Sequence, residues 1–301
     1  MGRLIDHPAV RSVIDHPMAA RVKRESKSAR IDLGHATAGL RPLPGALLVG
    51  AQRCGTTGLT SALFGSPHVV RPRVGKGAHY FSLNYWRPME WYRAQFPTRA
   101  HNVWVAGRHR GGLVGLDACP YYMFHPFAME RIGRDLPTAK LIVMLRDPVA
   151  RAHSHHRHEV SRGFEHVEDF ETALDLEQGR LEGQVELMAT DASVHSHAWE
   201  KYSYVSKGHY ADQLRVVFDH VGRERVMVIQ AEAYYADQAK ALAEVCDFID
   251  IPRVSPSSAD RRNGYDYSTM DRSVSDRLTS HFAPHNERLF DLLGEEWDWP
   301  R

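Results

Sequence analysis

The sequence has few of the features that mark secreted, membrane-spanning or disulfide-rich proteins. Among 301 residues there are three cysteines, at positions 54, 119 and 246. An odd, scattered set argues against a disulfide framework and indicates a reducing compartment. The sequence lacks an uncharged apolar run of about 18 residues, so no transmembrane segment is predicted. It also lacks the apolar core of a signal peptide. These absences predict a soluble, cytoplasmic protein.

An excess of one charge is also missing. Lys and Arg number 38 against 37 Asp and Glu, for a formal net charge of +1. This balance excludes a general polyanion-binding surface, so no nucleic-acid partner is expected, although a local basic cleft remains compatible. The hydrophobic and charged fractions, 43% and 25%, are ordinary for a globular chain of this length. Oligomeric state cannot be predicted from these features.

The first 42 residues differ in composition from the rest of the chain. They contain a basic run from Arg21 to Arg30 and end at Pro42 and Pro44. We predict a partly disordered N-terminal extension over residues 1–42, with a partner-binding or membrane-surface role as the alternative. No second change in composition follows, so residues 43–301 are predicted to form one domain.

Short apolar runs alternate with helical patterns from residue 45 onward. The runs at 46–49, 140–145 and 225–229 are rich in Val, Ile and Leu, as buried strands are. Helices are predicted over 56–64, 149–159, 211–220 and 239–249. The alternation predicts an α/β fold with a P-loop-like parallel sheet flanked by helices on both faces. Ligands of such sheets bind at the carboxyl ends of the strands.

One strand–turn–helix unit has a glycine-bracketed turn. Residues 50–57 have the GxxxxG frame of a phosphate-binding loop, but Thr56 stands where a nucleotide triphosphatase has lysine. This argues against an NTPase or a nucleotide kinase. The cation of the loop is Arg53 instead. Because a helix N-terminus presents unpaired N–H groups and partial positive charge, the unit is predicted to bind phosphate or sulfate.

A second unit of this kind follows residues 141–145. Arg146 stands at the end of the apolar run, Pro148 suits the first position of a helix, and Ser154 lies about two turns further on. The alternative is that Arg146 and Asp147 form a structural ion pair at the junction of strand and helix and bind no ligand. Two such units together, however, could hold a ligand with phosphate groups at both ends, provided that the helix carrying Ser154 runs back along the ligand.

These motifs resemble the sulfotransferases that use 3′-phosphoadenosine-5′-phosphosulfate, with the closest likeness to the heparan-type branch and its bacterial relatives. Residues 50–57 resemble the family's 5′-phosphosulfate loop, in which a lysine usually occupies the position of Arg53. Residues 146–154 resemble its 3′-phosphate motif. The likeness extends from about 45 to 299. It includes the segments 76–81, 91–97, 120–122, 207–214 and 284–289.

The resemblance implies an enzyme that moves a sulfuryl group from this donor to a hydroxyl or amine of a carbohydrate, glycolipid or small molecule. The acceptor cannot be identified from the sequence. No metal is expected to be required. In the family, a basic loop at the position of Arg261 and Arg262 closes over the 3′-phosphate, although exposed surface arginines are the alternative. The implied donor contacts are Gln52, Arg53, Cys54, Gly55, Thr56, Thr57, Arg146, Ser154, Arg261 and Arg262.

The sequence departs from the family at the expected catalytic base. Many heparan-type relatives have glutamate where this chain has Gly77. His79 lies two residues further on and could act as a base near pH 7. Asp117 is the other candidate, and Arg53 is expected to stabilise the leaving oxygen. If no base operates, the alternative is a catalytically impaired nucleotide-binding protein of the same fold.

Four histidines at 153, 155, 156 and 158 follow the second motif. The spacing of His155 and His158 would permit metal binding on a helix, but no carboxylate or cysteine is grouped with them. We therefore predict a solvated or substrate-facing helix surface and no metal site.

Overall fold

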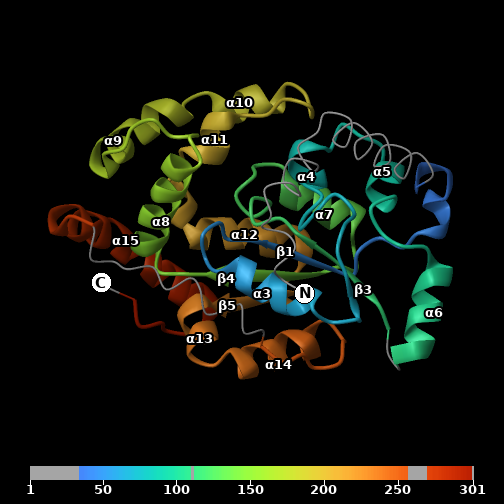
Figure 1. Cartoon of the computed structure of the whole chain (residues 1–301). Coiled ribbons are helices and arrows are strands. Elements are labelled where there is room, and N and C mark those ends of the chain that lie inside the picture. Colours follow the sequence, from blue (N-terminus) through green and yellow to red (C-terminus); the bar gives the residue numbers. More distant parts are fainter. Residues whose placement is uncertain (1–33, 110–111, 257–269, 300–301) are drawn as a thin grey trace, which may run out of the picture.

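A computed structural model describes residues 34–109, 112–256 and 270–299 (Figure 1). Five parallel strands form one sheet in the order β2-β3-β1-β4-β5. The strands are β1 (Ala46–Gly50), β2 (Val69–Val70), β3 (Val114–Ala118), β4 (Lys140–Leu145) and β5 (Val226–Gln230). The predicted parallel α/β sheet is confirmed, and so are the three predicted strands.

Continuous burial explains why the central strands could be predicted from apolar runs alone. Every residue of β1 is buried, as is β4 after its first residue. The two strands pair from Ala46 opposite Lys140, the register shifts between Leu48 and Gly50, and the pairing continues beyond β1, where Ala51 N donates to Met144 O at 2.7 Å. Their carboxyl ends therefore lie side by side at one edge of the sheet.

Helices lie on both faces of the sheet, as predicted. In Figure 1, α7 and α12 lie on one side of the strands, and α13 and α14 lie on the other. The chain also forms the helices α3 (Thr56–Phe64), α4 (Tyr80–Leu83), α8 (Pro148–Ser161), α11 (His197–Lys201), α12 (Tyr210–Val221) and α15 (Arg272–Leu293). The others are α5 (Met89–Arg93), α6 (Arg99–His109), α7 (Ala128–Asp135), α9 (Phe170–Leu181), α10 (Gln184–Ala189), α13 (Ala231–Ala236) and α14 (Gln238–Phe248), with 3₁₀ turns η1 (Ala38–Leu40), η2 (Ser206–Gly208) and η3 (Arg223–Arg225).

The described part of the N-terminal extension packs against the domain. Arg41 is buried, and its guanidinium donates to the carbonyl oxygen of Phe96 and to Thr37 Oγ1. Residues 34–42 are thus in contact with the segment that follows α5. The boundary at residue 43 stays a prediction, and residues 1–33 lie outside the described part of the chain. Among the described residues, none of the helices has the length and apolar character that a membrane span requires.

Candidate active site

The turn between β1 and α3 is built for close approach of a ligand. Gly55 has φ 85° and precedes α3, whose N-terminus no side chain caps. This left-handed backbone conformation favours glycine, and a Cβ at Gly55 would also lie 2.5 Å from the hydroxyl oxygen of Tyr235. The first amide groups of α3 are therefore available to an anion, as the sequence predicted.

A cation from another segment, Lys76, lies at this helix N-terminus. Lys76 Nζ donates to Thr56 Oγ1 at 3.3 Å and reaches Thr57 Oγ1 at 3.5 Å. Burial lowers the pKa of Lys76 to about 8. The side chain therefore still carries its proton at pH 7, but it holds the charge in a poorly solvated place. Lys76 was not among the predicted site residues, although it begins segment 76–81, which carries part of the family resemblance.

The two predicted anion-binding units come together. Arg53 Nε donates to Ser154 Oγ at 3.2 Å, which joins the first loop to α8. The side chain of Asp147 caps α8 by accepting from Val149 N, and Pro148 occupies the first helical turn. Arg146 stands at the end of β4, where its carbonyl accepts from Tyr210 Oη at 2.9 Å. The condition set for Ser154 is met, because α8 brings it back to the first loop.

The remaining predicted donor contacts differ in what their side chains can do. Cys54 is fully buried, and burial raises the pKa of its thiol to about 11, so its side chain packs and does not face an anion. Gln52 Oε1, in the loop itself, is buried and has no hydrogen-bond partner among the described residues. Arg261 and Arg262 lie outside the described residues.

His79 occupies the turn that begins α4. Its backbone is left-handed, with φ 50°, and its Nδ1 lies 3.1 Å from Cys119 Sγ. Burial lowers the pKa of His79, although Asp117 and Glu200 act in the opposite direction. The imidazole is therefore neutral at pH 7. In the tautomer in which Nδ1 donates to Cys119, Nε2 carries the lone pair that a base requires.

Asp117, the other candidate base, is fully engaged with the protein. It is inaccessible to solvent on β3, where Oδ1 accepts from Ala78 N at 2.8 Å. Its Oδ2 accepts from the hydroxyls of Tyr92 and Tyr122, at 2.8 and 3.0 Å. Burial raises the pKa of Asp117 and these hydrogen bonds oppose the rise. The carboxylate thereby fixes the main chain between Lys76 and His79.

The structure gives a physical reason for glycine at position 77. Ala118 N donates to Lys76 O at 3.2 Å, so this segment runs against the end of β3. A Cβ at Gly77 would lie 2.4 Å from the carbonyl oxygen of Ala118. A glutamate could not be placed there without moving the main chain.

The histidines of α8 do not gather into a site. His155 and His156 are buried, and their rings pack on Tyr204. His156 Nε2 bonds to the carbonyl of Val167 at 2.8 Å, and the ring of His153 lies against Phe170. The predicted solvated or substrate-facing surface is therefore wrong for His155 and His156.

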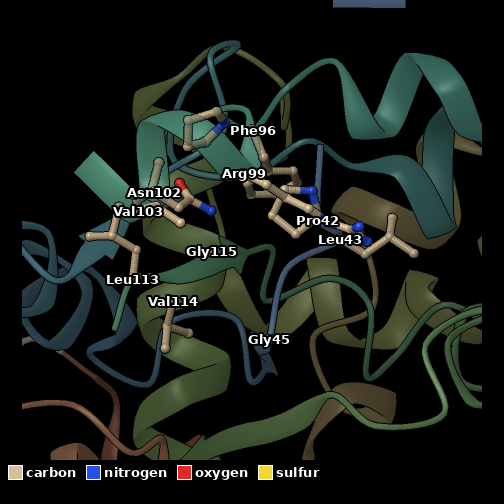
Figure 2. A pocket seen from close by; sticks show the side chains of 12 residues that line it. Pro42, Leu43, Gly45, Phe96, Arg99, Asn102, Val103, Leu113, Val114 and Gly115 are labelled. Carbon is tan, nitrogen blue, oxygen red and sulfur yellow. The ribbon is translucent and has the colours of Figure 1, made fainter. Parts of the chain in front are cut away.

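A pocket of about 400 Å³ lies at the opposite edge of the sheet (Figure 2). It is lined by Gly45 and Val114, where β1 and β3 begin, and by Phe96, Asn102 and Val103. None of the candidate catalytic residues lines this pocket. The candidate catalytic residues Arg53, His79 and Asp117 lie instead near the carboxyl ends of β1 and β3.

The fold and the site define an α/β protein with a parallel sheet and a P-loop-like turn between β1 and α3. A family model described as "Sulfotransferase domain" matches residues 43–263. The chain therefore belongs to the sulfotransferase family, as the resemblance of its motifs predicted.

Individual relatives agree with this assignment. Heparan sulfate glucosamine 3-O-sulfotransferase 3B1 of Mus musculus is 24% identical over 286 residues, 87% of this chain and 66% of that protein. Membrane-associated sulfotransferase kil1 of Dictyostelium discoideum is 23% identical over 93% of this chain and 71% of its own length. The chain thus spans just under two thirds of the 3-O-sulfotransferase. A sulfotransferase structure from Alicyclobacillus acidocaldarius matches with a TM-score of 0.63 and 26% identity, over 85% of this chain and 98% of that one.

Proposed function

We propose that this chain transfers a sulfuryl group from 3′-phosphoadenosine-5′-phosphosulfate to a hydroxyl or amine of a carbohydrate, glycolipid or small-molecule acceptor. The observation that carries the proposal is the junction of the two strand–turn–helix units: Arg53 Nε donates to Ser154 Oγ, and Lys76 Nζ donates to Thr56 Oγ1 at the N-terminus of α3. Arg146 follows β4, the strand that pairs with β1. Such a set suits a ligand with anionic groups at two ends.

The residues present fit this donor. Arg53, Lys76 and the amides of Thr56 and Thr57 would hold its 5′ end, and Arg146 and Ser154 would hold the 3′-phosphate. The donor supplies an activated sulfuryl group, whose departure leaves negative charge on the 5′-phosphate. Preorganised cations and amides stabilise charge that develops during the reaction more than charge already present.

His79 is the base that the geometry favours. Its neutral Nε2 would accept the proton of the acceptor hydroxyl as the nucleophile attacks. Asp117 suits a positioning role instead, because Ala78 and two tyrosines already occupy its oxygens. By holding Ala78 N, Asp117 would set the position of His79 and of Lys76.

Two measurements test the proposal in sequence. Thermal unfolding with 3′-phosphoadenosine-5′-phosphate should show a raised Tm without added magnesium. At a hundredfold excess over Kd, ligand binding stabilises the folded state by about 2.7 kcal/mol. ATP with magnesium is the comparator. A Tm shift that occurs only with ATP and magnesium would contradict the donor assignment. Labelled donor incubated with chemically diverse acceptors should then label at least one class. Donor binding without any transfer would favour a nucleotide-binding protein that has lost catalysis.

A further inference from the structure

Three histidines outside the proposed active site gather where α15 meets the start of α12. His209 directly precedes α12, and His281 and His285 lie one turn apart on α15. One ring nitrogen from each lies within 4.8 Å of those of the other two. Nε2 of His209 and Nε2 of His281 are 3.0 Å apart. Within the described ranges this is the single group of three metal-ligating side chains so closely placed.

Close packing between the two helices fixes this arrangement. A Cβ at Gly208 would lie 2.5 Å from the ring of Phe282, so the backbone before His209 is seated directly on α15. The rings of His209 and His285 stack with centroids 4.1 Å apart. His281 is exposed, and the other two histidines are half-buried. An ion from solvent can therefore reach the group.

The group offers three imidazole nitrogens and no carboxylate or thiolate ligand. Neutral imidazole nitrogens favour Zn²⁺, Cu²⁺ and Ni²⁺ over the hard cations Mg²⁺ and Ca²⁺.

Three local contacts must change when an ion enters, and the first is the hydrogen bond between His209 Nε2 and His281 Nε2. Arg288 donates to His285 Nδ1 at 2.7 Å, and it also reaches Asp212 at 3.4 Å. Arg288 can keep the carboxylate when it releases the imidazole. The stacked rings of His209 and His285 must also turn about their Cβ–Cγ bonds, so that their nitrogens point to one centre about 2.0–2.1 Å away.

We propose that His209, His281 and His285 bind one Zn²⁺ ion that clamps α15 to the start of α12. The fourth ligand would be water, because the exposed side of the group opens to solvent. The ion would hold the two helices together, and the group shares no residue with the proposed sulfuryl-transfer site.

The test uses the full chain without an affinity tag, stripped with EDTA and titrated with zinc chloride by calorimetry. One equivalent should bind, and the Tm should rise with zinc concentration. Cobalt substitution should give a visible absorption band of a four-coordinate nitrogen site. His281→Ala, on an exposed helix position, should weaken zinc binding at least about tenfold and remove that band.

His220→Ala is the matched control, because His220 is an exposed histidine at the other end of α12. It should keep the affinity and the cobalt band of the parent protein. Should the His281→Ala protein fail to fold, His281→Gln replaces it. The proposal is overturned when zinc does not bind in a 1:1 ratio, or when the His281 and His220 variants bind it equally.

Discussion

Replacing Lys76 with methionine is expected to raise stability and to remove most activity. Burial lowers the pKa of Lys76 from 10.5 to about 8. Keeping the ammonium charged in the folded state at pH 7 therefore costs about 3 kcal/mol. Because the folded pKa lies below the unfolded one, this cost is fully present below pH 8 and fades as the pH rises to 10.5. Methionine keeps the length of the side chain and removes the charge.

The Lys76→Met protein should thus be more stable at pH 7 by at most about 3 kcal/mol, less the lost contact with Thr56. Its advantage should shrink toward pH 10. Turnover should fall on the order of 10²-fold or more, because a preorganised charge at the leaving group is lost. Thermal unfolding at both pH values and single-turnover transfer of labelled sulfate measure the two effects.

Arg71→Met is the matched control, since Arg71 is an exposed cation five residues earlier in the same connection. It should leave turnover unchanged. A Lys76→Met protein with normal turnover and no gain in stability would show that Lys76 does not face a developing anion. The assignment of the 5′ end of the donor to α3 would then be wrong as well.

Three further predictions concern the base, the two anion contacts and Gly77. His79→Ala should abolish most transfer while nucleotide binding survives. The parent's kcat/KM should fall only below pH 6.5, because burial lowers the pKa of His79; an active variant with an unchanged pH profile would refute this role. Arg53→Ala should lower turnover on the order of 10²-fold, whereas Ser154→Ala should mainly raise the KM for the donor. Equal use of donors with and without a 3′-phosphate would remove Ser154 from the site. Gly77→Ala should cost about 1–3 kcal/mol in thermal unfolding, because its Cβ would meet the Ala118 carbonyl; Gly179→Ala, which meets nothing within 4 Å, is the control, and equal stability of the two would contradict the packing argument.

Strands β1, β4 and β5 were predictable because each is a continuous apolar run. The other side of the sheet, formed by β2 and β3, was not. β2 comprises only Val69 and Val70, too short for any periodicity to register. β3 contains Gly115 and Asp117, which interrupt its apolar pattern, and its buried carboxylate is explained only by donors from Ala78 and two tyrosines.

The two strand–turn–helix units were predictable because each has a local signal of glycine or proline beside a cation. Lys76 could not be placed in the same way. Its position depends on the main-chain bond between Ala118 N and Lys76 O, which links segments about 40 residues apart. The group of His209, His281 and His285 could not be predicted for the same reason, because His209 and His281 are 72 positions apart in the sequence.

The pairing of β1 with β4 fixes a length inside the active site. The two anion-binding turns leave adjacent strands, and adjacent strands lie about 4.8 Å apart because of their backbone hydrogen bonds. Side-chain replacement does not alter that spacing. Substitutions in the side chains of the two turns therefore leave the separation of their main chains unchanged, and under the proposed function this separation sets how far apart the two ends of the donor are held.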